Sequence, residues 1–132
     1  MAQFSMIPER RKILEKFPDY AVTSEPAGGR VTITCHGTQL ASSCAALLVR
    51  ESKHANVYYL PREDVDLSLF SRTDHSTYCP FKGHASYWSL NLPDHSEDNV
   101  VWSYEGPYPE VSELKDYLSF YSSQVEVNFE PD

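Results

Sequence analysis

The sequence is poor in cysteine, and the cysteines present are not spaced for a disulfide framework or a thiolate zinc site. The 132 residues include only Cys35, Cys44 and Cys79. Their number is odd and none of them forms a C-x-x-C pair. The pattern therefore argues against a disulfide-stabilised domain and against a zinc module built from thiolates. We expect three free thiols in a reducing compartment.

Basic residues are also scarce, with 11 Lys and Arg against 19 Asp and Glu and a formal net charge of -8. The imbalance is greatest from Glu105 to Asp132, where Lys115 is the single base. Binding to nucleic acid needs a basic face that neutralises phosphates. We therefore expect neither nucleic acid nor an anionic membrane surface to be a partner of this acidic protein.

Long apolar runs are missing as well. No run approaches the roughly 20 residues that span a bilayer, and the opening MAQFSMIPERRKILEKF lacks an apolar segment followed by a small-residue cleavage site. These features predict a cytoplasmic protein without a membrane span. The chain is long enough for one ordered core, so we divide it into an N-terminal helical extension (1–19) and a single domain (20–132).

The hydrophobic pattern predicts a mainly β fold with minor α structure. Helical spacing at 6–17 indicates a short N-terminal helix, and from Tyr20 the period changes to two, which is typical of strands. We expect about seven to nine short strands in a curled antiparallel sheet, either small and barrel-like or a tent-like sandwich. Residues 62–72 fit a turn or a single helical turn.

Residues 109–124 (PEVSELKDYLSFYSSQ) have the strongest helical signal of the chain. Pro109 suits the first turn, and Val111, Leu114, Leu118 and Tyr121 share one face at helical spacing. We predict a C-terminal helix here that packs across the sheet.

The stretch DHSTYCPFKGHASYW, residues 74–88, combines more aromatic and ionisable side chains than either a solvated loop or a core strand carries. With residues 58–64 it predicts a polar-aromatic pocket for a small polar or anionic ligand. Arg62 and Lys82 would supply charge, Asp74 would orient His75, and tyrosines would form the walls. The predicted ligand-binding residues are Tyr59, Arg62, Glu63, Asp74, His75, Tyr78, Lys82 and Tyr87.

Two other functions remain open from the residues alone. The first is a hydrolase or transferase that uses the same pocket, with His75 as general base and Cys79 as nucleophile. In an extended strand these two residues lie some 13 Å apart, so their contact requires a bend at Pro80 or a histidine from elsewhere. The second is a protein-interaction module or homodimer that uses a sheet edge and the acidic tail.

The sequence predicts no metal and no cofactor. Its five histidines, among them His36 and His95, have no ligand spacing such as H-x-H or H-E-x-x-H. The D-x-D at Asp64 and Asp66 is of the kind that binds Mg²⁺, but no Gly-Ser turn precedes it as nucleotidyl transfer would require.

Three segments, YYLPREDV (58–65), DHSTYCPFKGHASYWSL (74–90) and VWSYEGPYPEVSELKDYLSFY (101–121), resemble the domain-of-unknown-function family 427. The resemblance spans roughly residues 20 to 129. It implies a small, single-domain, mostly β cytosolic protein of a family sometimes labelled nucleotidyltransferase-like, for which the chain has no catalytic signature. The family motif falls on Tyr59, Pro61, Arg62, Glu63, Asp64, Asp74, His75, Thr77, Cys79, Pro80, Lys82, Gly83, Tyr87, Trp88, Trp102 and Tyr104.

The chain departs from that family pattern at two positions. Cys44 stands where an Arg is expected after the Ser pair, and His84 stands where an acidic or small polar residue is usual. If that Arg normally reaches the pocket, this chain binds its ligand differently.

Overall fold

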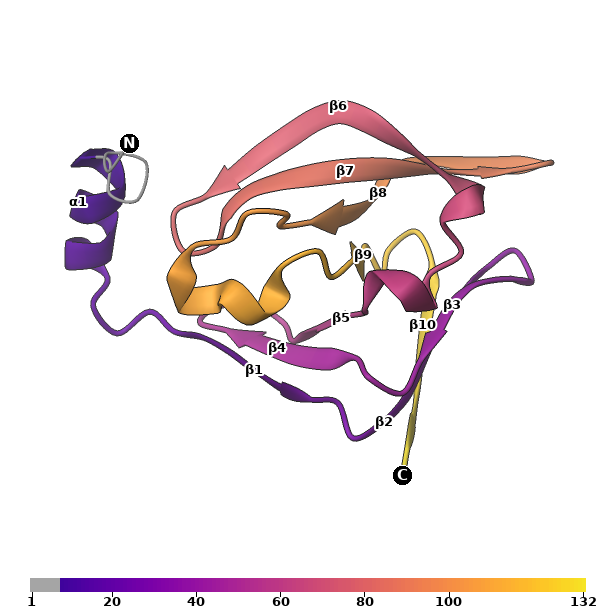
Figure 1. Cartoon of the computed structure of the whole chain (residues 1–132), viewed down its shortest axis with the longest axis horizontal. Helices are drawn as coiled ribbons and strands as arrows, with labels where there is room; N and C mark the ends of the chain where they lie inside the picture. Colours follow the sequence, from indigo (N-terminus) through magenta and orange to yellow (C-terminus); the bar gives the residue numbers. More distant parts are fainter. Residues whose placement is uncertain (1–7) are drawn as a thin grey trace.

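The computed structural model describes residues 8–132, a mainly β chain that begins with one short helix (Figure 1). Three short 3-10 helices lie between the strands. The elements are α1 (Pro8–Lys16), β1 (Val22–Pro26), β2 (Gly29–Cys35), β3 (Thr38–Ser43), β4 (Leu47–Glu51), β5 (Val57–Tyr59), η2 (Arg62–Asp64), η3 (Leu67–Leu69), β6 (Phe70–Cys79), β7 (Gly83–Leu92), β8 (His95–Ser103), η4 (Pro109–Leu114), β9 (Ser119–Phe120) and β10 (Glu126–Pro131).

The strands form three antiparallel sheets, in the orders β1–β4–β5, β10–β2–β3 and β6–β7–β8–β9. Within residues 8–132 these sheets do not close into a barrel. The predicted mainly β class and the short N-terminal helix are confirmed. Three small sheets, however, take the place of one curled sheet.

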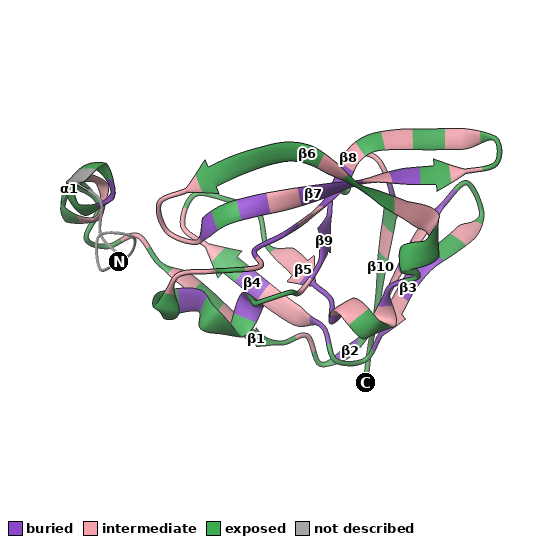
Figure 2. Ribbon diagram, turned by 45° about the horizontal axis from the view of Figure 1, so that its top comes forward, coloured by how far each residue is buried: buried purple, intermediate pink, exposed green. Residues whose placement is uncertain are grey.

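Alternation along the strands decides which side chains are buried. In β2, the side chains of Val31, Ile33 and Cys35 are buried. Arg30, which directly precedes Val31, is exposed. Figure 2 shows the buried residues along the strands that face the interior, whereas β6 is exposed along most of its length. The core therefore lies between the sheets, with β6 as an outer edge strand.

The predicted C-terminal helix at 109–124 is wrong. Only η4 is helical in this region, and the chain then joins the β6–β7–β8–β9 sheet as β9. Leu118 exchanges two backbone hydrogen bonds of 2.8 Å with Leu60, which requires extended backbone there. Asp116, in the left-handed region with φ of 65°, turns the chain toward this bridge. The pattern correctly marked Val111 and Leu114 as buried, but it did not identify the element.

The helical turn predicted within 62–72 is found as two short 3-10 helices, η2 and η3, whereas residues 70–72 already belong to β6. In contrast, β7 and β8 extend further than the pattern indicated. They form a long hairpin that turns at residues 93–94. Near the turn β8 alternates between exposed and half-buried residues, so no apolar period marks this part of the strand.

Helix α1 is held against the β structure through Arg10, whose side chain is only 2% exposed. Its Nε donates a hydrogen bond of 2.8 Å to the Pro80 carbonyl, and its guanidinium lies 3.1 Å from Glu110 and 3.7 Å from the centre of the Tyr108 ring. The start of the predicted helix, residues 6 and 7, lies outside the described residues. Among residues 8–132, no helix has the length and apolar character needed to cross a bilayer.

We expect Gly29→Ala to lower the free energy of unfolding by about 1–3 kcal/mol, the usual cost of an extra methyl in a packed site. An added Cβ would lie 2.2 Å from the backbone oxygen of Glu130 on the neighbouring strand β10. Urea unfolding measures the change. Gly106→Ala is the matched control, because an added Cβ there meets no atom within 4 Å. Equal stability of the two variants would contradict this account.

Candidate functional site

A cavity of about 560 Å³ opens between the β1–β4–β5 sheet and the β6–β7–β8–β9 sheet. The ends of several strands and the turn between β6 and β7 contribute its walls. The lining residues are Tyr20, Glu51, His54, Ala55, Val57, Tyr59, Tyr78, Cys79, Pro80, Phe81, Lys82, Trp102, Phe120, Tyr121 and Ser122.

An ion pair between Glu51 and Lys82 is the main charged feature of this cavity. Glu51 ends β4 and Lys82 lies in the β6–β7 turn, and both side chains are only 11% exposed. Lys82 Nζ hydrogen-bonds to one carboxylate oxygen, and the Tyr20 hydroxyl donates to the other. His54 Nε2 lies 3.8 Å from that second oxygen. The carboxylate is thus engaged on both oxygens.

These contacts set the protonation states in the cluster. Burial alone would raise the pKa of Glu51, but hydrogen bonds from Lys82 and Tyr20 and the nearby positive charge hold it below its usual range. For Tyr20, burial and the bond to Glu51 raise the pKa of the phenol above its ordinary value. At neutral pH Glu51 is therefore ionised and Tyr20 remains a hydrogen-bond donor.

Aromatic rings form the rest of the cavity wall. Tyr20 stacks on Phe81 with ring centres 3.8 Å apart, and Trp102 packs on Tyr121 at 4.5 Å. The Trp102 indole donates a hydrogen bond of 3.0 Å to the hydroxyl of the fully buried Tyr59. Burial raises the pKa of Tyr59, so this hydroxyl stays protonated at neutral pH.

Tyr78 stands at the more exposed side of the cavity. Its hydroxyl lies 2.7 Å from that of Tyr108, and burial together with this hydrogen bond raises the pKa of Tyr78 to about 12. On the same side its ring packs 4.8 Å from His84 on the adjacent strand β7. Tyr78 is therefore a neutral hydrogen-bonding group at neutral pH.

The structure brings four of the sequence-predicted site residues together around the cavity, namely Tyr59, Tyr78, Cys79 and Lys82. Tyr87 lies behind the wall, because it is buried and its hydroxyl is 3.5 Å from that of the lining residue Tyr121. Besides Tyr87, the predicted residues that are not among the lining residues are Arg62, Glu63, Asp74 and His75.

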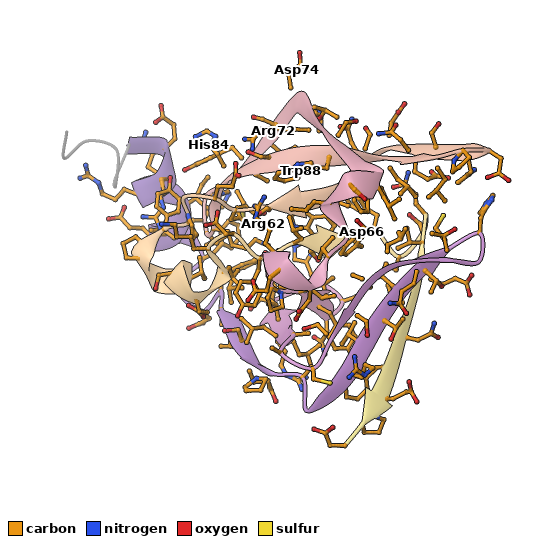
Figure 3. All side chains as sticks on the ribbon, turned by 45° about the vertical axis from the view of Figure 1, so that its right-hand side comes forward. Arg62, Asp66, Arg72, Asp74, His84 and Trp88 are labelled. Carbon is orange, nitrogen blue, oxygen red and sulfur yellow. The ribbon has the colours of Figure 1, made fainter. Side chains whose placement is uncertain are left out.

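Arg62 lies instead in a second charged cluster on another surface (Figure 3). Arg62 and Arg72 each lie 5.1 Å from the centre of the Trp88 ring, and both pair with Glu105, at 3.5 Å and 2.7 Å. The Arg72 hydrogen bonds keep the pKa of Glu105 below its usual range. Arg62 also donates to the Asp116 carbonyl at 3.2 Å. These contacts account for Arg62 as a structural residue, and none of them requires a ligand.

The three other predicted residues are spread over the surface. Asp74 is exposed and projects outward from the bend of β6 (Figure 3). His75, also exposed, packs its ring 4.5 Å from Tyr87. Glu63 borders a separate surface hollow next to η2 and β3. The aromatic and ionisable stretch at residues 74–88 therefore faces more than one surface.

Sequence reasoning missed five polar residues of the cavity, Tyr20, Glu51, His54, Tyr121 and Ser122. They come from segments remote from residues 74–88, and only the packing of sheets brings them there. One signal was available for Glu51, because an acidic residue at the end of the apolar strand 45–51 needs a cationic partner if it is buried. The sequence did not indicate that this partner is Lys82.

We expect Glu51→Gln to lower the free energy of unfolding at pH 7 by about 3–5 kcal/mol, since it leaves the largely buried Lys82 without its anionic partner. The double variant Glu51→Gln, Lys82→Met should recover most of this loss. Denaturant unfolding of both variants measures the effect. A single variant as stable as the wild type would contradict it.

The same pair predicts a pH dependence. Because the folded-state pKa of Glu51 lies below its ordinary value, the pair stabilises the fold above the unfolded-state pKa, and this contribution is lost as pH falls through the folded-state pKa. The wild type should therefore lose stability toward acid more steeply than the double variant. Parallel slopes in urea unfolding across the acid range would overturn this expectation.

We expect His75→Ala to leave the rate of iodoacetamide labelling of Cys79 unchanged, because His75 packs on Tyr87 while Cys79 lines the cavity. Peptide mass spectrometry follows Cys79 separately from the other thiols. His84→Ala, a second exposed histidine, is the matched control. A slower reaction confined to His75→Ala would show that the two residues act together.

A family model described as NTP_transf_9, Domain of unknown function (DUF427), matches residues 23–131. No curated protein matches the chain. The match extends from the second residue of β1 to the end of β10 and includes every strand residue that lines the cavity. The chain belongs to the DUF427 family.

Proposed function

We propose that this protein binds a small polar ligand that carries a planar ring, in the cavity between the two sheets. The observation that carries the proposal is the Glu51–Lys82 pair, held largely out of water in the wall of an otherwise aromatic cavity. A volume of about 560 Å³ lies within the range of small-molecule sites, which are mostly apolar with a few placed polar groups.

The ion pair supports a binding role because it is a poor device for stability alone. Removing two charges from water costs free energy that their attraction often only balances. A pair beside an open cavity, however, presents both a donor and an acceptor to a ligand. Lys82 has further ammonium protons to donate, and Glu51 has lone pairs beyond those that Lys82 and Tyr20 occupy.

The aromatic walls favour a ligand with a flat ring. The Tyr20–Phe81 and Trp102–Tyr121 pairs border the same cavity, and stacked or edge-on contacts between rings add binding free energy beyond area burial. The Tyr59 hydroxyl provides a fixed polar contact among them.

The charge distribution favours a neutral polar ligand over an anion. Glu51 neutralises Lys82, and Arg62, the other expected cation, pairs with Glu105 on another surface. The other basic side chain of the cavity lining, His54, lies beside the Glu51 carboxylate and is 62% exposed. The three free thiols Cys35, Cys44 and Cys79 support a cytoplasmic location for such a binding protein.

The two other functions gain less support. The enzyme hypothesis loses its His75–Cys79 arrangement, since only Cys79 lines the cavity. For an interaction module, the acidic tail is not a free segment, because β10 pairs with β2 along its whole length. Deletion of residues 123–132 would remove a strand of the sheet and so would not test the tail alone.

Native mass spectrometry of the protein purified gently from its own cells, followed by denaturing mass spectrometry, should reveal a bound small molecule. We expect Ala55→Trp to lose it, because Ala55 is exposed and lines the cavity, so an indole there fills ligand space. Ala45→Trp is the matched control, an exposed alanine outside the cavity lining, and it should keep the ligand.

A second readout uses Trp102 fluorescence in a Trp88→Phe variant, where Trp102 is the remaining tryptophan. A panel of nucleobases, nucleosides, aromatic amino acids and hydroxybenzoates provides the probes. Quenching by a panel member in the Trp88→Phe, Ala45→Tyr variant but not in the Trp88→Phe, Ala55→Tyr variant supports the proposal, and neither change adds a tryptophan. An apo mass together with no response to the panel, or equal binding by both variants, overturns it.

A further inference from the structure

A second cluster of chemically active side chains lies at the tips of two hairpins, away from the cavity lining. His36 is in the turn between β2 and β3, and His95 is the first residue of β8 after the β7–β8 turn. Figure 1 shows both hairpin tips on the same side of the molecule. The two imidazole rings stack with centres 3.7 Å apart and planes 19° from parallel. Residues 59 positions apart in sequence are thus in contact.

Cys35 completes this group. It ends β2 and is buried at 3% exposure. The Sγ of Cys35 and one ring nitrogen each of His36 and His95 all lie within 4.8 Å of one another. A thiolate and two imidazoles are the ligands that Zn²⁺ and similar metals prefer.

Neighbouring side chains hold the His95 imidazole in position. Glu97 Oε2 lies 2.6 Å from His95 Nε2, and Gln124 fixes the other carboxylate oxygen with a hydrogen bond of 2.9 Å. His95 Nε2 is buried, and despite this short approach it has no aligned hydrogen bond among the described residues. A carboxylate against a metal-ligating histidine is the usual arrangement for fixing its tautomer and ring position.

The local charge also favours a cation. The carboxylate of Glu97, 2.6 Å from His95, adds negative charge at the group, which a bound divalent cation would offset. The backbone of His36, with φ of 49°, forms with Gly37 the two-residue turn of the β2–β3 hairpin, which fixes the position of His36 at its tip.

We propose that Cys35, His36 and His95 bind a borderline-soft divalent transition metal such as Zn²⁺, with Glu97 as the residue that positions His95. Three protein ligands leave a fourth position for water, as in zinc sites that carry out chemistry. The oxygen-preferring cations Mg²⁺ and Ca²⁺ do not suit a thiolate and two imidazoles. The sequence did not predict this site, because its ligands come from two hairpins.

Titration of the reduced, metal-free full chain with Co²⁺ tests the proposal. We expect one equivalent to bind and to give a thiolate-to-cobalt charge-transfer band with visible d–d bands, both lost when Zn²⁺ is added. Cys35→Ser should remove the charge-transfer band, and His36→Ala and His95→Ala should each weaken binding. Glu97→Gln should keep the band and weaken affinity by about 10–100-fold, the usual effect of losing a carboxylate that holds a metal-binding histidine in place.

Cys44→Ser and Cys79→Ser are the matched thiol controls, and His54→Ala is the matched histidine control. All three residues lie outside the proposed ligand set and should leave the cobalt spectrum and affinity unchanged. A spectrum without the charge-transfer band, the same loss in Cys35→Ser and Cys44→Ser, or Co²⁺ binding that survives all three ligand substitutions would overturn the site. Circular dichroism of each variant separates loss of ligand from loss of fold.

Discussion

The reciprocal backbone hydrogen bonds between Leu60 and Leu118 are the constraint on which the rest of the structure depends. They join the end of β5 to the start of β9, and so tie the β1–β4–β5 sheet to the β6–β7–β8–β9 sheet. Both leucines are fully buried, where an unpaired backbone group would be costly. The bridge therefore fixes how the two sheets meet, and the cavity lies between them.

The bridge also sets where the side chains next to it in sequence lie. Tyr59 precedes Leu60 and is buried beside the cavity with its hydroxyl on Trp102, whereas Arg62 follows and reaches the Glu105 cluster. The extended backbone at Leu118 also ends any helix after η4. A few residues of chain thus direct a cavity-lining tyrosine to one side and a paired arginine to another.

The polar chemistry of the protein is divided among separate places, each built from segments far apart in the sequence. The Glu51–Lys82 pair joins β4 to the β6–β7 turn, and the Arg62–Glu105 cluster joins η2 to the end of β8. At the hairpin tips His36 meets His95. In each case antiparallel pairing positions the backbone, and a charged or imidazole side chain completes the contact across elements.

The sequence by itself determined the mainly β class, the short N-terminal helix, the helical turn within 62–72 and the DUF427 motifs. These depend on local period, turn chemistry and short motifs, which a chain carries without its partners. The sequence also indicated Tyr59, Tyr78, Cys79 and Lys82 as pocket residues. In the structure these four residues line one cavity.

Only the tertiary structure decided the rest. It replaced the predicted C-terminal helix by η4 and β9, because one long-range bridge outweighs the weak helical preference of a short segment. It separated Arg62 and His75 from Lys82 and supplied Glu51 and Tyr20 to the cavity. Which side chains share a site depends on how sheets pack, and contacts between residues tens of positions apart leave no period in the sequence.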